Sequence, residues 1–382
     1  MEANESPLKN VRITALETFH VRPRWLLLKI STDAGVCGWG EPVLEGRALT
    51  VETAVREYGR MLIGRNPCAI EALWQEMHRG TFYRGGAVLT SALSGIEQAL
   101  WDIKGKLLGV PVHELLGGAV RDRVRMYAWM PGAEVGDYVE HAVRARAGSG
   151  FTAFKLVPLP AVQAIESPKL IDRVVKDVAT VRESLGWDVD LALDFHGRAR
   201  LAVARTLVRE LAPLKPLFIE EPVLPESLAA LRRLRDATDI PLAAGERLFT
   251  RWAFRDLIRE HLVDIIQPDL SHVGGIFEAR KLAAMAETEE ICLAPHCPLG
   301  PVALAACLQL AACTPNFFCQ EHMTLGEGLL REPFVVKDGY ITPPAGPGLG
   351  IEIDEAGVAA RAFDGQWDTP QFRLADGSFA EW

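Results

Sequence analysis

Short apolar segments alternate with amphipathic segments through the middle of this chain. Eight apolar segments of strand length follow one another between residues 124 and 321, namely VRMYAW, FTAFKL, VDLALDF, PLFIEE, IPLAAGE, VDIIQPD, ICLAPH and NFFCQE. Segments with helical periodicity lie between them, at residues 137–148, 168–185, 200–211, 226–237, 251–260, 275–288 and 300–312. Eight strands separated by seven helices predict a parallel barrel of α/β class.

The regions on either side of this pattern differ from it. VRITALETFHV, WLLLKIST and GVCGWGEP predict three strands, which helices near residues 48–62, 67–78 and 87–108 follow. After residue 330 the alternation stops, and the stretch DGYITPPAGPGLGIEIDE is rich in Gly and Pro. We expect an α+β capping domain at residues 1–122, a barrel domain at 123–330, and a C-terminal segment at 331–382 that returns to the capping domain.

Ionisable residues stand at the ends of the predicted barrel strands. Their spacing is regular, 23 to 27 residues per step, along the series Asp194, Glu220, Glu246, Asp269, His296 and Glu321. Each step corresponds to one strand, one loop and one helix. The series therefore belongs at the C-terminal ends of the strands, where barrel enzymes place their active sites.

Three of these residues, Asp194, Glu220 and Glu246, are carboxylates on successive strands. Neighbouring strands lie about 4.8 Å apart, so the three charges repel one another unless a cation lies between them. Hard oxygen ligands favour Mg²⁺, one ion per subunit, with Mn²⁺ as an alternative. A single carboxylate could instead cap a helix or pair with Arg198 or Arg247. Strand alternation does not say whether Glu220 or its neighbour Glu221 faces the barrel axis.

Two histidines belong to the same predicted mouth of the barrel. His196 lies two residues after Asp194, so on a strand both side chains would point to the same face. His296 ends strand seven next to Asp269 on strand six, and a carboxylate that binds one imidazole nitrogen makes the other a better base. Lys155 and Glu321 end strands two and eight; they are candidates for binding an anionic substrate, or ordinary surface charges.

This set of residues suits proton abstraction next to a carboxylate. With a cation on the substrate carboxylate, His296 can remove the neighbouring proton and form an enediolate. If His196 then protonates a β-hydroxyl, water leaves and a 2-keto-3-deoxy acid forms; if it returns a proton to carbon, an epimer forms. A protein that binds metal or sugar acids without turnover is a third possibility.

Composition narrows the class of partner. The formal charge of −9, with 41 basic residues among 50 acidic ones, argues against nucleic acid. The apolar runs are too short for a membrane helix, and MEANESPLKN lacks the apolar core of a signal peptide. The seven cysteines show no CxxC spacing and several lie in apolar runs, which indicates free buried thiols and a cytoplasmic protein.

Several motifs resemble one family. LDFHGR, FIEEP, LAAGER, IIQPDLSHVGG, LAPHCPLGP and CQEH, together with RPRWLLLKI, GWGEPVLEGRA, PGLGIEIDE and AEW, are similar to the mandelate racemase subgroup of the enolase superfamily. The resemblance covers nearly the whole chain and implies a modified (β/α)7β barrel with a capping domain. It implies Asp194, Glu220 and Glu246 as Mg²⁺ ligands, His296 with Asp269 as the base, His196 as the acid, and Glu321 as a contact of the substrate or intermediate.

The resemblance also implies a substrate class. An acid-sugar dehydratase is expected, with D-galactonate as the first substrate to test; another aldonate or aldarate, or a 2-epimerase reaction, is the alternative. Loops at residues 22–25 and 45–47 would set specificity through Arg24, Glu45 and Arg47, with Tyr83 as a further candidate. Val157 stands where racemases of this subgroup carry a second catalytic lysine, which argues against racemisation by two bases. A homo-oligomer is expected.

Overall fold

The computed structural model describes residues 8–132 and 134–382. Its N-terminal part contains an antiparallel sheet in the order β1-β2-β3, formed by β1 (Ile13–Val21), β2 (Trp25–Thr32) and β3 (Cys37–Gly40). The first half of β2, residues 25–28, is buried on both faces, which explains its run of apolar residues. Most of the MEANESPLKN stretch, on which the expectation of no signal peptide rests, lies outside the described residues.

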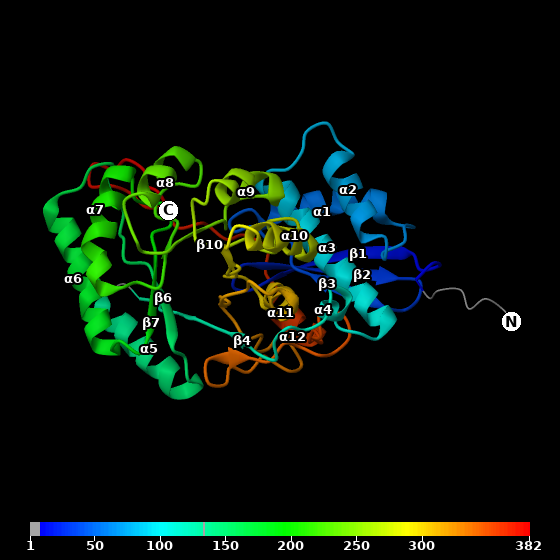
Figure 1. The fold of residues 1–382 in the computed structure, drawn as a ribbon. Helices are drawn as coiled ribbons and strands as arrows, with labels where there is room; N and C mark the ends of the chain where they lie inside the picture. The colour runs from blue at the N-terminus through cyan, green and yellow to red at the C-terminus, as the bar shows by residue number, and fades with distance from the viewer. Residues whose placement is uncertain (1–7, 133) are drawn as a thin grey trace.

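Three helices follow this sheet, as expected from the sequence: α1 (Ala48–Leu62), α2 (Ile70–Arg79) and α3 (Ala87–Leu108). Helices α1 and α3 pack on the sheet, and α2 packs on α3. Helix α3 is buried along most of its length, because it lies between the sheet and the barrel (Figure 1). Strand β3 runs directly against it, since a Cβ at Gly40 would lie 1.8 Å from the backbone oxygen of Gly95. Glycine at both positions allows this close approach.

The barrel sheet is parallel, and its strands follow the order of the chain. Seven strands pair in the order β11-β10-β9-β8-β7-β6-β5. They are β5 (Ala128–Trp129), β6 (Ala153–Leu156), β7 (Asp190–Asp194), β8 (Ile219–Glu220), β9 (Leu242–Ala244), β10 (Ile265–Ile266) and β11 (Cys292–Leu293). The barrel helices are α5 (Val135–Ser149), α6 (Pro168–Leu185), α7 (Leu201–Leu211), α8 (Leu228–Arg235), α9 (Thr250–Arg259), α10 (Ile276–Glu287) and α11 (Pro301–Cys313).

The eighth expected strand closes the ring through two short contacts. Phe317 bridges Leu293 and Gln320 bridges Met126, both in parallel orientation. The first expected strand, 124–129, is divided: β4 (Val124–Arg125) pairs antiparallel with β12 (Tyr340–Ile341), and only β5 joins the barrel. The prediction of one continuous strand was wrong because the returning C-terminal segment supplies a partner for its first residues.

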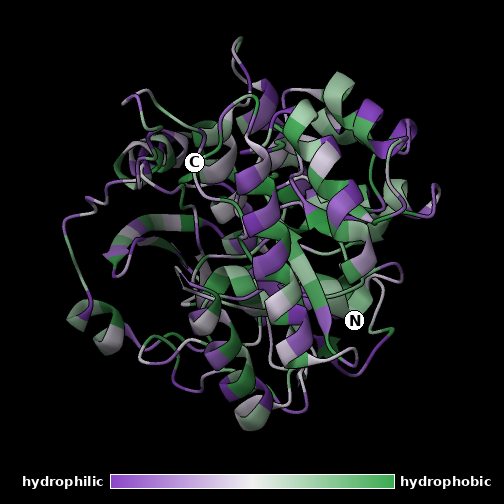
Figure 2. Cartoon of the chain, turned by 90° about the vertical axis from the view of Figure 1, so that its left-hand side faces the viewer, coloured by the Kyte–Doolittle hydropathy of each residue, from purple (hydrophilic) through white to green (hydrophobic). Residues whose placement is uncertain are grey.

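The barrel helices cover the outside of the sheet. Helix α6 buries Ile171, Val174, Val178, Val181 and Leu185, a helical spacing that forms one apolar stripe. Figure 2 shows hydrophobic and hydrophilic bands alternating along these helices. The stripes face the strands, and the polar faces are left to solvent.

The segment after residue 330 returns to the N-terminal part, and it includes β12 and the short helix α12 (Glu355–Ala360). Ala362 bridges Val21 of β1, and the Leu349 amide donates to Asp102 Oδ1 of α3 at 2.8 Å. Two further short helices, α4 (Val112–Leu115) and η1 (Ala212–Leu214), were not predicted. They span one turn or less, too short for a periodic signal.

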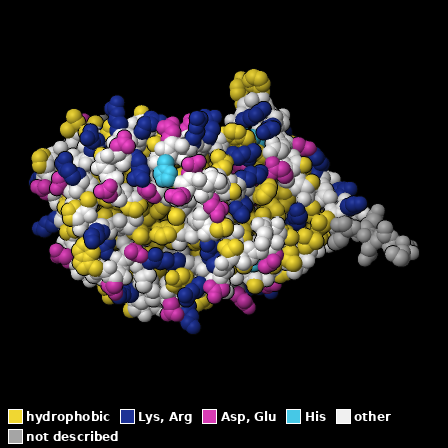
Figure 3. Space-filling view, in the orientation of Figure 1, with side chains coloured by type: hydrophobic (Ala, Val, Ile, Leu, Met, Phe, Trp, Pro, Cys, Tyr) yellow, Lys and Arg dark blue, Asp and Glu magenta, His cyan; other side chains and the backbone are white. Residues whose placement is uncertain are grey.

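The helices, the cysteines and the surface charges each bear on the expectations from composition. No helix of the described residues has the length and apolarity that crossing a membrane requires. All seven cysteines are free thiols, and four of them are buried. On the face drawn in Figure 3, basic and acidic side chains are interspersed, and a hydrophobic tip projects at the loop between α2 and α3.

Candidate active site

Alternation along the strands builds the floor of the site. One buried residue from each barrel segment meets in the barrel interior: Tyr127, Ala153, Ala192, Phe218, Ala243, Ile265, Ala294 and Cys319. Two positions later, on the same face, six of these segments carry Trp129, Lys155, Asp194, Glu220, His296 and Glu321. All but Glu220 border one cavity, and Glu220 lies in its floor.

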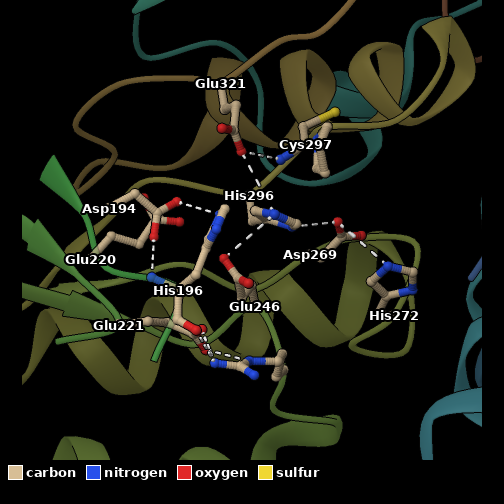
Figure 4. A network of polar contacts seen from close by, with 12 residues as sticks. Asp194, His196, Glu220, Glu221, Glu246, Asp269, His272, His296, Cys297 and Glu321 are labelled. Atoms are coloured by element: carbon tan, nitrogen blue, oxygen red, sulfur yellow. Dashed lines mark hydrogen bonds and ion pairs between the residues drawn. The ribbon is translucent and has the colours of Figure 1, made fainter. Parts of the chain in front are cut away.

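The same alternation decides between the two adjacent glutamates. Glu220 follows the inward face of Phe218, whereas Glu221 turns away to Arg247, whose Nε lies 3.0 Å from Glu221 Oε1. This arrangement leaves Glu220 as the carboxylate that faces the other acidic residues (Figure 4).

Three carboxylates form a compact cluster. Asp194, Glu220 and Glu246 each offer an oxygen, and these atoms lie within 4.8 Å of one another. Glu220 Oε1 and Glu246 Oε2 are buried and have no hydrogen-bond partner. Buried carboxylate oxygens without donors are costly unless a cation compensates them. The donor set therefore fits a divalent metal ion with hard oxygen ligands.

The charges in the cluster perturb one another. Burial raises the pKa of Glu246 well above its usual value, and the charges of Glu221 and Asp194 raise it further. Burial also raises the pKa of Glu220, with a second contribution from Asp194. In both residues, burial and neighbouring carboxylates disfavour the anion, and a bound cation would offset this effect.

Lys155 lies beneath this cluster and is 1% exposed. Its Nζ is 2.8 Å from Glu220 Oε2, 2.8 Å from Glu321 Oε1 and 3.4 Å from Asp194 Oδ2. Burial disfavours the ammonium ion, but Glu220 and Glu321 outweigh it and raise the pKa of Lys155 well above its usual value. Lys155 is therefore a permanent cation. It stands on β6 and joins the ends of β7, β8 and the eighth barrel segment, which carry Asp194, Glu220 and Glu321.

His296 and Asp269 form a hydrogen-bonded pair. His296 Nδ1 lies 2.9 Å from Asp269 Oδ2, which leaves Nε2 free to act on a substrate. Nε2 is 3.5 Å from Glu246 Oε2 and 4.0 Å from Glu321 Oε2 (Figure 4). Burial disfavours the imidazolium, but these carboxylates, Glu246 first, outweigh it and raise the pKa of His296 well above its usual value.

The capping part of the chain holds the loop that follows Asp269. The Ser91 hydroxyl is 2.9 Å from His272 Nδ1, and Glu97 accepts hydrogen bonds from the Ile276 amide at 2.7 Å and the Phe277 amide at 2.9 Å. Glu97 thus caps the N-terminus of α10 from helix α3. The polar residues within α3 serve this contact, a role that their helical spacing alone does not reveal.

His196 reaches the cavity by a route that strand alternation does not describe. Strand β7 ends at Asp194, and His196 has a φ of 48°, in the left-handed region. Its amide donates to Asp194 Oδ1 at 2.8 Å and its Nε2 lies 3.0 Å from Asp194 Oδ2. The prediction that His196 overlooks the cavity is confirmed, but the explanation by shared strand face was wrong, because a tight turn places the ring.

The cavity has a volume of about 360 Å³, enough for a small sugar acid. Arg24 and Glu45 from the capping loops line it, and Arg24 Nη2 lies 3.7 Å from Glu45 Oε1. Arg47 is exposed and Tyr83 is 84% exposed, and neither borders the cavity. Their roles in specificity stay predictions.

Several wall residues were not predicted from the sequence. They are Leu44, Trp129, Arg247, Phe249, His272, Pro298, Met323, Thr369 and Trp382. Trp129 could have been found from strand alternation, because it lies two residues after Tyr127 and therefore on the same inward face. Thr369 and Trp382 come from the C-terminal segment, whose path carries no periodic signal.

Two known domain families match most of this chain. Residues 4–117 match the mandelate racemase / muconate lactonizing enzyme N-terminal domain, and residues 137–357 match the enolase C-terminal domain-like family. The chain belongs to the mandelate racemase/muconate lactonizing enzyme family. The resemblance inferred from the motifs is confirmed, and the α/β fold with a capping domain is the fold of this family.

Full-length relatives extend the comparison within the family. The chain is 50% identical to D-galactonate dehydratase of Variovorax paradoxus (strain S110), over 97% of this chain and 100% of that protein. D-Galactonate dehydratase of Ralstonia pickettii (strain 12J) has the same identity and coverage. A solved enolase structure from Agrobacterium radiobacter, with bound Na and L-malate, is 31% identical and superposes with a TM-score of 0.90, over 97% of this chain and 100% of that one.

Proposed function

We propose that this chain is a D-galactonate dehydratase, a hydro-lyase that forms 2-dehydro-3-deoxy-D-galactonate and water. The observation that carries the proposal is that His196, His296 and two residues of the acidic cluster, Asp194 and Glu246, border one cavity of sugar-acid size. Relatives that are 50% identical over their full length and bear this name support the choice of substrate.

Asp194, Glu220 and Glu246 are the proposed ligands of one Mg²⁺ per subunit, with Mn²⁺ as a substitute. The buried oxygens of Glu220 and Glu246 that have no hydrogen-bond partner support this assignment. When bound, the ion supplies positive charge that favours neutral His296 beside Glu246 and draws electron density from a substrate carboxylate.

His296 is the proposed base. Asp269 holds its Nδ1 at 2.9 Å, so Nε2 is the nitrogen that takes the proton from C2 of the substrate. The electron pair left by that proton moves into the carboxylate and forms an enediolate. Glu321 is the proposed contact of this intermediate; it borders the same cavity, and its Oε2 accepts from the Cys297 amide at 2.9 Å.

His196 is the proposed acid. The enediolate electrons form a C2–C3 double bond as the C3–O bond breaks, and His196 donates a proton to the departing hydroxyl, which leaves as water. The resulting enol takes up a proton at C3, releases the proton of its C2 hydroxyl and becomes the 2-keto acid. Arg24, Glu45 and Lys155, which border the cavity, are proposed to bind the hydroxyl and carboxylate groups of the substrate. A role for Arg47, which lies outside the cavity, stays a prediction.

The position of Val157 supports dehydration over racemisation. Its backbone oxygen accepts a hydrogen bond from the Tyr138 hydroxyl at 3.3 Å, and the residue does not border the cavity. An amine base from this position is therefore absent. A cytoplasmic location, a homo-oligomeric state and domain limits at residues 122 and 330 stay predictions.

Product analysis with an acid-sugar panel tests the proposal. The protein is incubated with Mg²⁺ and D-galactonate or other aldonates and aldarates, and 2-keto acid is measured as its semicarbazone. We expect turnover of D-galactonate, none in His296→Ala, and full turnover in His141→Ala, a control on the outer helix α5.

Other results would reassign the function. Turnover of a different sugar acid would change the substrate. An isomer that carries solvent deuterium, with no keto acid, would indicate an epimerase. Binding of aldonates without any turnover would indicate a binding protein.

A further inference from the structure

Two indole rings lie against His196. The ring centroid of Trp382 is 5.3 Å from that of His196, with an interplanar angle of 34°, and Trp129 is at 6.3 Å and 20°. Trp129 comes from a barrel strand, but Trp382 comes from the far end of the C-terminal segment. Trp382 is itself 43% exposed, so its indole covers the imidazole from the solvent side.

The segment that carries Trp382 is attached to the loop that carries His196. The Arg198 guanidinium lies 4.6 Å from the centre of the Phe372 ring, and Arg200 Nη2 is 2.7 Å from Glu381 Oε1. Phe372 in turn contacts Trp382 edge-to-face at 6.4 Å. Residues 196–200 and 372–382 therefore form one packed unit.

Backbone hydrogen bonds shape this part of the segment. The Ala380 amide donates to the Phe372 oxygen at 3.0 Å, and the Leu374 amide donates to the Ser378 oxygen at 2.9 Å. These bonds fold residues 372–380 back on themselves and bring Glu381 and Trp382 next to Phe372. The position of the indole thus follows from local structure as well as from its contacts in the cavity.

His196 needs an external contact to fix its ring. The residue lies beyond the end of β7, in a left-handed turn, so the strand does not set its side-chain direction. Within residues 8–132 and 134–382, its side chain makes one polar contact, with Asp194 at 3.0 Å, and its buried Nδ1 has no hydrogen-bond partner. Because Asp194 is also a proposed cation ligand, we expect ring packing to contribute to the orientation of this imidazole.

We propose that Trp382 is a positioning residue that orients His196 toward the leaving hydroxyl. The inference rests on the proposed dehydration. Trp382 then affects the second step, expulsion of the C3 hydroxyl, and not the first step, abstraction of the C2 proton. His296 and Asp269 follow β11 and β10, and no hydrogen bond, ion pair or ring contact joins either of them to Trp382 among the described residues. Loss of the indole then slows expulsion of the hydroxyl and leaves abstraction of the C2 proton intact.

The test compares two rates in D₂O for wild type, Trp382→Ala and Trp382→Phe. Formation of keto acid reports the complete reaction, and deuterium in the recovered substrate reports C2 abstraction followed by return. We expect Trp382→Ala to lose roughly 10-fold to 100-fold in keto-acid formation, while the ratio of exchange to elimination rises at least about 10-fold. Trp382→Phe keeps a ring and recovers most of the turnover.

Control variants separate positioning from stability. Trp187→Ala removes an indole that is 65% exposed and packs on Arg182, so it should leave both rates unchanged. Trp382→Leu keeps apolar bulk without a ring and replaces Trp382→Ala if the latter fails to fold. Arg200→Ala cuts the ion pair to Glu381 and should shift the ratio in the same direction by a smaller factor.

Two results would overturn the inference. One is wild-type turnover in folded Trp382→Ala and Trp382→Leu; the other is an equal loss of exchange and elimination, which would mean that Trp382 shapes the whole cavity. If wild type dehydrates no sugar acid, the proposed function fails instead. The contact itself is then tested by NMR, because removing an adjacent indole must move the His196 Cε1–H resonance, which His196→Asn identifies.

Discussion

Replacing Asp269 with Asn tests whether the carboxylate that holds His296 is required for proton abstraction. Asp269 is 1% exposed, accepts the Ser271 amide at 2.7 Å, and lies 2.9 Å from His296 Nδ1. Burial disfavours its anion, but His272 and His296 outweigh that effect and lower the pKa of Asp269. Asn has the same shape, so the change removes the charge and leaves the packing in place.

The size of the effect follows from this single contact. A hydrogen bond to a charged group contributes about 1.5–3 kcal/mol. If that contribution is present only when His296 gains its proton, kcat falls about 10-fold to 150-fold. KM should change little, because Asp269 does not border the cavity that receives the substrate.

Two rates measured in D₂O check this expectation. Keto-acid formation and C2 exchange should fall together, because His296 acts in the first step. Asp190→Asn is the matched control. Asp190 is the first residue of β7, at the end of the strand away from Asp194, and it pairs with Arg125 at 2.5 Å. Wild-type kcat in Asp269→Asn, or lost elimination with exchange retained, would refute the assignment of Asp269 to the base.

Three further predictions concern the cation, the interface between the two parts of the chain, and the capping loops. EDTA should abolish turnover and Mg²⁺ restore it, and Mg²⁺ at 100 times its dissociation constant should stabilise the protein by about 2.7 kcal/mol; thermal unfolding of Glu220→Gln should show no such Mg²⁺-dependent shift. Burial raises the pKa of Glu97 to about 7, so protonation of Glu97 stabilises the folded state. This stabilisation is complete below the pKa of the unfolded state, about 4.5, and is lost as the pH rises through about 7. Unfolding free energies should then show wild type losing up to about 3 kcal/mol relative to Glu97→Gln between pH 5 and 8, and parallel curves would contradict the linkage. Arg24→Ala should raise KM for D-galactonate several-fold, whereas Arg56→Ala, an exposed arginine of α1 paired with Glu52, should not; equal values of KM would remove Arg24 from the binding site.

Periodicity in the sequence determined the fold class and most of the floor of the site. Helices α1, α3 and α6 begin and end where their patterns predict. The regular spacing of strand-end residues brought Asp194, Glu220 and His296 to one end of the barrel, because each strand, loop and helix has a nearly constant length. Local alternation is encoded within a few residues, so a single sequence suffices to detect it.

Tertiary structure decided which neighbours these residues have. Strand alternation left Glu220 and Glu221 equivalent, and only the inward position of Phe218 and the pairing of Glu221 with Arg247 distinguished them. His196 was expected on a strand but lies in a left-handed turn, since the strand ends at Asp194, two residues before it. Such a turn depends on contacts that the local pattern does not contain.

The walls of the cavity depend most on long-range packing. Trp382 meets His196 because residues 372–380 fold back and dock on Arg198 and Arg200, and no periodic pattern in that irregular segment predicts where it lies. The sequence alone therefore determined the chemistry of the strand ends, which short-range geometry controls. The enclosure of that chemistry was decided by the tertiary structure, because it requires segments far apart in the chain to meet.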